Sequence, residues 1–191
     1  MKPCLLIRHG ETDLAGRFCG HSDPLLNRAG RLQVQHAADL LADTPPDVIY
    51  SSDLQRATQT AQMIAQRFGL SLIVRPGLRE ICFGDWEGLS WAKIEDQYPT
   101  QAKLWIEQYP AGSIPSGEAF GMFQLRVRME LEFLLEQAEN HAVVAVTHGG
   151  FIRTALTDVY GLSMDAACER SASYAAIVPF HSANPVPGAP V

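Results

Sequence analysis

Short apolar runs alternate along the chain with longer segments in which apolar residues recur at helical spacing. The runs have the length of β-strands and lie at residues 4–8, 48–51, 72–74, 142–146 and 174–178. The helical segments cover residues 28–41, 54–68, 118–140 and 149–160. Strands that alternate with helices are typical of an α/β domain. We therefore predict a three-layer α/β/α sandwich with a mostly parallel central sheet.

The predicted helices carry boundary signals and apolar faces. In the helix over residues 28–41 we expect Leu32, Leu40 and Leu41 at apolar positions, and the Thr44-Pro45-Pro46 turn ends it. Gly69 is placed to cap the helix over residues 54–68. The longest helix, over residues 118–140, shows one apolar stripe formed by Phe120, Phe123, Val127, Leu131 and Leu134.

Two segments depart from this alternation. Residues 79–117 are rich in Gly, Pro and Trp, and their short helical pieces indicate an excursion from the sheet that carries specificity. Residues 181–191 contain three prolines and are expected to be a disordered tail. We therefore interpret residues 1–180 as a single domain with a lid-like excursion.

Composition and the lengths of the apolar runs indicate which cellular compartment to expect. The chain has 191 residues, of which 47% are hydrophobic, so a sizeable core is expected. Its apolar runs are far shorter than the roughly 20 residues that a membrane span needs. The N-terminus reaches Arg8 after few apolar residues and lacks the features of a signal peptide. A cytoplasmic location is the resulting expectation, and four scattered cysteines are expected to be free thiols.

The charge balance narrows the class of ligand. The net charge of −6 argues against binding to nucleic acid or to an anionic membrane. Arginines nevertheless outnumber lysines by twelve to three. Because the guanidinium fork suits bidentate contacts with phosphate or carboxylate, this bias hints at a small anionic ligand.

Candidate chemistry gathers where the predicted strands end, which is where ligands bind in such sheets. The first strand ends in Arg8-His9-Gly10, and a late strand ends in Thr147-His148-Gly149-Gly150, which opens a helix. Arg56 follows the second strand. Each residue alone has an ordinary structural interpretation, but their coincidence favours an anion site. A metal site is the competing use of two histidines, although no HExxH pair or carboxylate cluster accompanies them.

These residues would give a phosphate ester bound at this edge candidate partners for its hydrolysis. Arg8 and Arg56 would hold the phosphate oxygens, and a neutral His9 would attack phosphorus. His148 would donate to the transferring oxygens. Glu80 is the preferred proton donor to the leaving alkoxide. Glu11 is the alternative, although its place directly after His9 and Gly10 favours a structural role.

These residues belong to an ordered series of motifs that resembles one known family. The series consists of Leu6-Ile7-Arg8-His9-Gly10-Glu11-Thr12, Gly20-x-x-Asp23-x-Leu25, Ser51-Ser52-Asp53-Leu54-x-Arg56-Ala57, Glu80-x-x-Phe83-Gly84-x-Trp86-Glu87-Gly88 and Thr147-His148-Gly149-Gly150. It resembles the histidine phosphatase (phosphoglycerate mutase-like) superfamily and spans the chain from Leu5 to Arg153.

The resemblance implies a phosphohistidine mechanism that needs neither a metal nor an organic cofactor. The implied catalytic residues are His9, Glu80, Arg8, Arg56 and His148. The implied substrate-binding residues are Arg8, Arg56, His148, Gly149, Thr12, Gly20 and Cys19. The expected partner is a small phosphorylated metabolite, and the protein is expected to be a monomer or a homodimer.

The superfamily contains phosphatases and mutases, and the short chain favours a phosphatase. The compact loop over residues 16–23 is similar to the loop of α-ribazole phosphatases, which act on a precursor of cobalamin. Alternatives are a phosphatase of broad specificity for sugar or nucleotide phosphates, a phosphoglycerate mutase, and a phosphate-binding module without turnover.

Two features bear on ligand binding. Many members carry a phosphate-binding asparagine where this chain has Ala15, and Cys19, Ser22 or a backbone N–H of the loop is a candidate substitute. Trp86, Trp91, Trp105 and residues 114–118 lie in the excursion, where they would either stack on an aromatic base or pack in the core.

Overall fold

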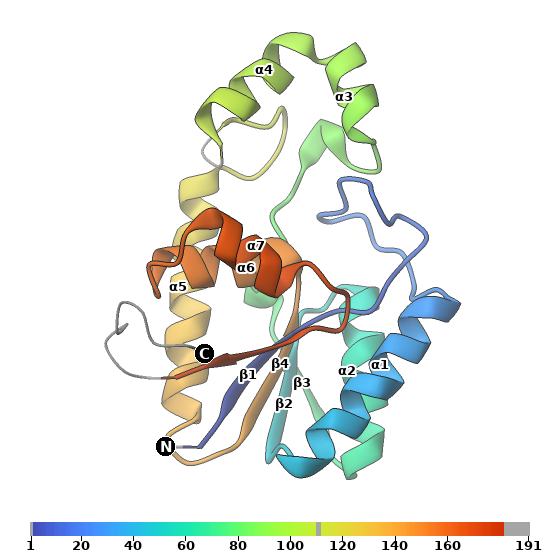
Figure 1. Cartoon of the computed structure of the whole chain (residues 1–191), viewed down its shortest axis with the longest axis vertical. Coiled ribbons are helices and arrows are strands. Elements are labelled where there is room, and N and C mark those ends of the chain that lie inside the picture. The colour runs from blue at the N-terminus through green and yellow to red at the C-terminus, as the bar shows by residue number, and fades with distance from the viewer. Residues whose placement is uncertain (1, 110–111, 182–191) are drawn as a thin grey trace.

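The computed structural model describes residues 2–109 and 112–181, which contain a five-stranded sheet in the order β3-β2-β4-β1-β5 (Figure 1). The strands are β1 (Cys4–Arg8), β2 (Val48–Ser51), β3 (Leu72–Val74), β4 (Val143–Thr147) and β5 (Ile177–Phe180). Only β5 is antiparallel to its neighbour. The mostly parallel sheet of the sequence prediction is confirmed.

The two histidine motifs become neighbours because β1 and β4 pair in parallel. Arg8 pairs with Thr147 at the ends of these strands, so His9 and His148 follow at the same edge of the sheet. All five residues of β4 are buried, as its unbroken apolar run predicts for a central strand. The carboxyl edge therefore presents both motifs side by side.

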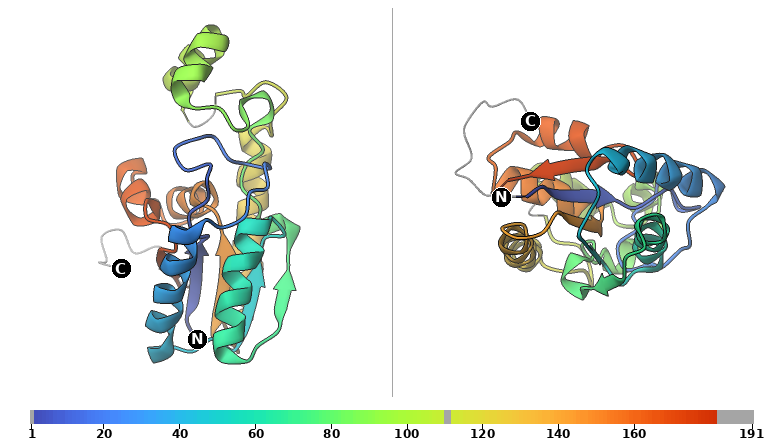
Figure 2. Two further views of the ribbon diagram at one scale, coloured as in Figure 1. Left: turned by 90° about the vertical axis from the view of Figure 1, so that its right-hand side faces the viewer. Right: turned by 90° about the horizontal axis from the view of Figure 1, so that it is seen from below.

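Helices cover both faces of the sheet, which gives the predicted three layers (Figures 1 and 2). On one face, α1 (Arg28–Leu40) and α2 (Gln55–Phe68) pack on side chains such as Ile7, Ile49 and Val146. On the other, α5 (Phe120–Gln137) and α6 (Gly149–Asp158) pack on Leu6 and Ala145, and α7 (Met164–Ser171) packs against α6. The helices over residues 54–68 and 118–140 form with shifted ends, and Gly69 caps α2 in the left-handed conformation.

Three local predictions are wrong in detail. Leu32 and Leu40 are exposed on α1, whose buried face instead uses small residues and Val34. The strand predicted at residues 174–178 lies at Ile177–Phe180, because Ala175 has a positive φ of 57° and belongs to a loop. The sequence prediction also missed α7, whose residues show little apolar periodicity.

The excursion over residues 79–117 rises beyond the carboxyl edge of the sheet (Figure 2). It contains the short helix η3 (Gly84–Trp86) and the helices α3 (Trp91–Gln97) and α4 (Pro99–Gln108). Trp86 is fully buried in the core, and Trp105 is 9% exposed. Two further short helices, η1 (Leu41–Asp43) and η2 (Pro76–Leu78), lie outside this segment.

The predicted tail lies outside the described residues except for His181. No helix in residues 2–109 and 112–181 combines the length and the apolar character that crossing a membrane requires.

Candidate active site

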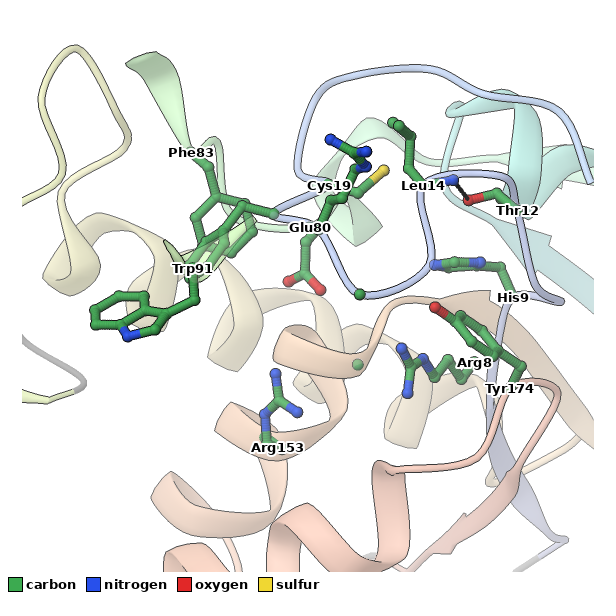
Figure 3. A pocket seen from close by; sticks show the side chains of 14 residues that line it. Arg8, His9, Thr12, Leu14, Cys19, Glu80, Phe83, Trp91, Arg153 and Tyr174 are labelled. Carbon is green, nitrogen blue, oxygen red and sulfur yellow. Dashed lines mark hydrogen bonds between the residues drawn. The ribbon is translucent and has the colours of Figure 1, made fainter. Parts of the chain in front are cut away.

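A cavity of about 300 Å³ opens at the carboxyl edge of the sheet (Figure 3). Its floor is the end of β1 and the start of α6, and its rim comes from the loop over residues 12–19 and from the excursion. The lining residues are Arg8, His9, Thr12, Leu14, Gly16, Arg17, Phe18, Cys19, Glu80, Phe83, Trp91, Gly149, Arg153 and Tyr174. Three of them are arginines and one is a carboxylate, so the cavity suits an anion.

The imidazole of His9 is held in one orientation on the cavity wall. Its Nδ1 lies 2.7 Å from the carbonyl oxygen of Gly10, which places the proton on Nδ1 and leaves the lone pair on Nε2. Nε2 accepts a hydrogen bond from Nε of Arg56 at 3.2 Å. Burial lowers the pKa of His9 well below its usual value, and the charge of Arg56 lowers it further. His9 therefore presents a neutral nitrogen nucleophile.

Arg56 is a fully buried cation that contacts His9 of the cavity wall. Its Nη1 donates to the carbonyl oxygen of Ser22 at 2.7 Å, and its Nη2 donates to those of Gly20 at 2.7 Å and Cys19 at 3.2 Å. Among the described residues, no carboxylate forms an ion pair with it. Because its charge is balanced only by neutral acceptors, namely backbone carbonyl oxygens and His9, the site has a strong preference for an anion.

His148 lies beside His9, with 5.1 Å between the ring centroids. It is fully buried, and its Nε2 lies 3.0 Å from Oγ of Ser52, whereas Nδ1 has no hydrogen-bond partner among the described residues. Burial lowers the pKa of His148 well below its usual value, and Arg56 adds to this effect. Neither His148 nor Arg56, both predicted site residues, is among the residues that line the cavity.

Arg8 lines the cavity beside His9 and is held by backbone carbonyls. Its Nη1 donates to the carbonyl oxygens of Ser171 and Ala172, and its guanidinium lies over the ring of Tyr174, 4.2 Å from the centroid. Its buried Nε has no partner among the described residues. A phosphate oxygen would supply the missing acceptor.

Glu80 reaches the cavity from the excursion and meets the first turn of α6. Its Oε2 accepts from the backbone N–H of Gly150 at 2.8 Å, and its Oε1 accepts from that of Ile81 at 3.1 Å. A Cβ on Gly150 would lie 2.3 Å from Oε1, so a side chain at this position would displace the Glu80 carboxylate. Glu11 instead accepts from the side chain of Asn27, which caps α1, and does not line the cavity.

The remaining predicted ligands divide into two groups. Thr12, Cys19 and Gly149 line the cavity, but Gly20 does not and instead supplies a carbonyl oxygen to Arg56. Ala15 is not among the lining residues. No three His, Cys, Asp or Glu side chains gather as metal ligands anywhere in residues 2–109 and 112–181.

Sequence reasoning missed Tyr174, Arg17 and Arg153 as cavity residues. Figure 3 shows the hydroxyl of Tyr174 directed into the cavity beside Arg8 and His9. Its ring centroid lies 5.8 Å from that of His9. Arg153 lies one helical turn beyond the Gly149-Gly150 pair on α6. This spacing was the one sequence signal that could have placed Arg153 at the predicted anion site. Tyr174 sits in a loop and gave no signal.

We expect Tyr174→Phe to weaken substrate binding about twofold to tenfold, because one neutral hydrogen bond to the phosphate is lost. Tyr174→Leu should cost more, since Arg8 also loses its aromatic partner. Steady-state KM and the inhibition constant of inorganic phosphate measure both effects. Equal behaviour of Tyr174→Phe and the wild type in both measurements would remove the hydroxyl from the site.

Glu87 organises the loop that holds Arg56. Its two oxygens accept from the backbone N–H groups of Gly20, His21, Ser22 and Phe83 at 2.7–3.1 Å, and from Oγ of Ser22 at 2.6 Å. Burial raises the pKa of Glu87, but the hydrogen bonds from Ser22, His21 and Phe83 outweigh this and lower it. The carboxylate therefore fixes the carbonyl oxygens that orient the Arg56 guanidinium.

We expect Glu87→Gln to lower kcat by roughly tenfold to a hundredfold, because its amide nitrogen faces N–H donors and loosens the carbonyl cage around Arg56. Glu95→Gln, at an exposed position of α3, is the matched control. Rates and thermal unfolding are compared for both. A loss of stability with an unchanged kcat would show that Glu87 serves only the fold.

The family model described as "Histidine phosphatase superfamily (branch 1)" matches residues 4–184 of the chain. The chain belongs to the histidine phosphatase superfamily. The predicted family and the predicted phosphatase class are thereby confirmed.

Relatives of this histidine phosphatase act on several different esters, as their names state. Phosphoserine phosphatase 1 of Hydrogenobacter thermophilus is 33% identical over 78% of this chain and 71% of its own length. Glucosyl-3-phosphoglycerate phosphatase of Mycobacterium tuberculosis is 35% identical over 78% and 70%. The crystal structure of α-ribazole phosphatase from Shigella flexneri superposes with a TM-score of 0.78 at 26% identity, over 87% of this chain and 84% of that one.

Proposed function

We propose that this histidine phosphatase hydrolyses a small phosphate monoester through a phosphohistidine on His9. The observation that carries the proposal is the neutral Nε2 of His9, a residue of the cavity wall that lies beside Arg8 and accepts a hydrogen bond from Arg56. A dianionic phosphate at this point gains two charge-assisted sets of hydrogen bonds, and phosphorus lies within reach of the nucleophile.

The first chemical step transfers the phosphoryl group to His9. Nε2 attacks phosphorus in line, the bond from phosphorus to the ester oxygen breaks, and protonated Glu80 gives its proton to the leaving alcohol. Arg8, Arg56 and the Nδ1 side of His148 stabilise the charge on the equatorial oxygens. The hydrogen bond from Arg56 to His9 must open, so that Nε of Arg56 turns to a phosphate oxygen.

The second step returns the enzyme to its starting state. Glu80, now ionised, takes a proton from water, whose oxygen attacks phosphorus as the bond to His9 breaks. Inorganic phosphate then leaves the cavity. No step of this cycle uses a cofactor.

As the specific substrate we propose α-ribazole 5'-phosphate. The compact loop over residues 16–23 and the likeness to the Shigella flexneri α-ribazole phosphatase support this choice. Phosphoserine and glucosyl-3-phosphoglycerate, which the names of other relatives indicate, are the competing substrates. A broad phosphatase of sugar or nucleotide phosphates is the alternative, and a phosphoglycerate mutase is a weaker one.

Phosphate release from a panel of esters tests the proposal. The panel contains α-ribazole 5'-phosphate, phosphoserine, 3-phosphoglycerate, ribose 5-phosphate and nucleoside monophosphates. A kcat/KM for α-ribazole 5'-phosphate at least about a hundredfold above the rest would support it. Similar rates on all esters would favour the broad phosphatase, and transfer between the hydroxyls of phosphoglycerate instead of to water would favour the mutase.

We expect Glu80→Gln to slow alkyl phosphates by roughly a hundredfold to ten-thousandfold, because a poor leaving group needs its proton. 4-Nitrophenyl phosphate should lose much less, since its phenolate leaves without one. Glu11→Gln, which alters the alternative donor, is the matched control. The ratio of kcat/KM for the two esters is the measurement, and an equal loss on both would assign the proton to another group.

A further inference from the structure

A second cavity of about 190 Å³ adjoins the first and is largely apolar. Phe18, Phe83 and Arg153 line both cavities. The inner wall of the second is formed by Ile81, Trp105, Tyr109, Phe120, Phe123 and Met164. These side chains come from the excursion, α4, α5 and α7, so this cavity lies where the excursion meets the helices of the domain.

The second cavity lies next to the proton donor of the proposed reaction. Gly150 lines it, and the backbone N–H of the same residue donates to Oε2 of Glu80. A leaving oxygen that takes its proton from Glu80 therefore lies at the junction of the two cavities. The alcohol portion attached to that oxygen would then extend toward the second cavity.

The size and the walls of this cavity fit a flat apolar ring. Apolar cavities of about 150 Å³ bind benzene, so about 190 Å³ accommodates one aromatic ring. Aromatic walls add edge and face contacts to the gain from burial. The side chain of Arg153 forms no hydrogen bond or ion pair with another described residue, and its cationic group at the junction disfavours a cationic ring.

We propose that the second cavity is a binding site for a neutral, ring-sized apolar group in the alcohol portion of the substrate. The proposal rests on the function proposed above, which places the reacting ester oxygen beside Glu80. It narrows the substrate class to monoesters whose alcohol carries such a ring within a few bonds of the ester.

Two alkyl esters measure the contribution of the ring to kcat/KM. Propyl phosphate and 3-phenylpropyl phosphate have alcohols of similar acidity and differ in the phenyl group alone. Full burial of the ring predicts a kcat/KM for the phenyl ester that is roughly tenfold to a hundredfold higher. A ratio near one would overturn the proposal.

A variant that fills the second cavity tests whether the preference for the phenyl ester arises there. Met164→Trp, at the half-buried start of α7, should bring the ratio of the two esters close to one. Met129→Trp, at an exposed position of α5, is the matched control and should keep the wild-type ratio. A ratio that survives in Met164→Trp would place the ring elsewhere and overturn the proposal.

Binding without turnover separates this inference from the function on which it rests. Saturation-transfer NMR with 3-phenylpropan-1-ol reports contact with the ring even when no ester is hydrolysed. Binding to the wild type and to Met129→Trp, with loss in Met164→Trp, supports the cavity site whether or not phosphate is released. The absence of binding to the wild type overturns the site, whereas a failure to hydrolyse every ester overturns only the function.

Discussion

His9→Ala is expected to reduce phosphate release by roughly 10⁴-fold or more, as the removal of other catalytic nucleophiles does. The reason is that no other group on the cavity wall offers a neutral nitrogen whose second ring atom is fixed by a backbone carbonyl. Arg8, Arg56 and His148 remain in this variant, so phosphate should still bind. The measurements are single-turnover rates and titration with inorganic phosphate.

A control must show that His9→Ala is still folded. The His9 side chain forms hydrogen bonds with Gly10 O and Arg56 and packs beside the rings of His148 and Tyr174, so circular dichroism and thermal unfolding are compared with the wild type to show that the variant keeps its fold. Trapping adds a positive test, because the wild type quenched during turnover should carry alkali-stable phosphate on His9. Turnover of His9→Ala within tenfold of the wild type, or a label on another residue, would contradict the covalent mechanism.

The pH dependence of the wild type follows from the same environment. Burial and then Arg56 lower the pKa of His9, so the nucleophile stays deprotonated well below the usual histidine pKa of about 6.5. As pH falls toward mildly acidic values, activity should therefore persist until the substrate phosphate takes up its second proton, near pH 6. A loss of kcat near pH 6.5 with saturating substrate would show an ordinary, solvated imidazole.

The adjacency of His9 and His148 could be predicted from the sequence because parallel strands place their ends at one edge. The apolar runs of β1 and β4 are unbroken and short, and each strand is followed at once by a histidine. The pairing of Arg8 with Thr147 then fixes the register. When the functional residues directly follow parallel strands, the apolar pattern that predicts the strands and the motifs at their ends are enough to predict which residues lie together.

Other parts of the molecule could not be predicted, for physical reasons. The buried face of α1 uses Gly30, Ala37 and Ala38, which allow close packing but give a weak hydrophobic signal beside the exposed Leu32. The cage around Arg56 depends on Glu87, which lies more than sixty residues from the loop that it holds. Tyr174 reaches the cavity from an irregular loop, where no periodicity guides prediction.

Arg56→Ala is expected to lower kcat/KM by roughly a hundredfold to a thousandfold, the typical cost of removing one group that stabilises transition-state charge. The structure gives a specific reason. The guanidinium is fully buried, is balanced only by neutral oxygens and His9, and therefore acts on the phosphate with little screening by water. Removing it should also weaken the binding of inorganic phosphate or vanadate.

Arg56→Lys separates charge from geometry. Lysine keeps the positive charge but cannot at once contact Ser22, Gly20 and the phosphate, so it should recover little of the lost rate. Arg67→Ala, at an exposed position in the last turn of the same helix, is the matched control for charge and for helix propensity. Near-complete rescue by lysine would show that charge alone is required, and activity within tenfold of the wild type in Arg56→Ala would exclude this residue from the phosphate site. We expect neither rescue by lysine nor near-wild-type activity of Arg56→Ala. The carbonyl oxygens around Arg56 orient a planar guanidinium, and the single ammonium group of lysine cannot make the same set of contacts.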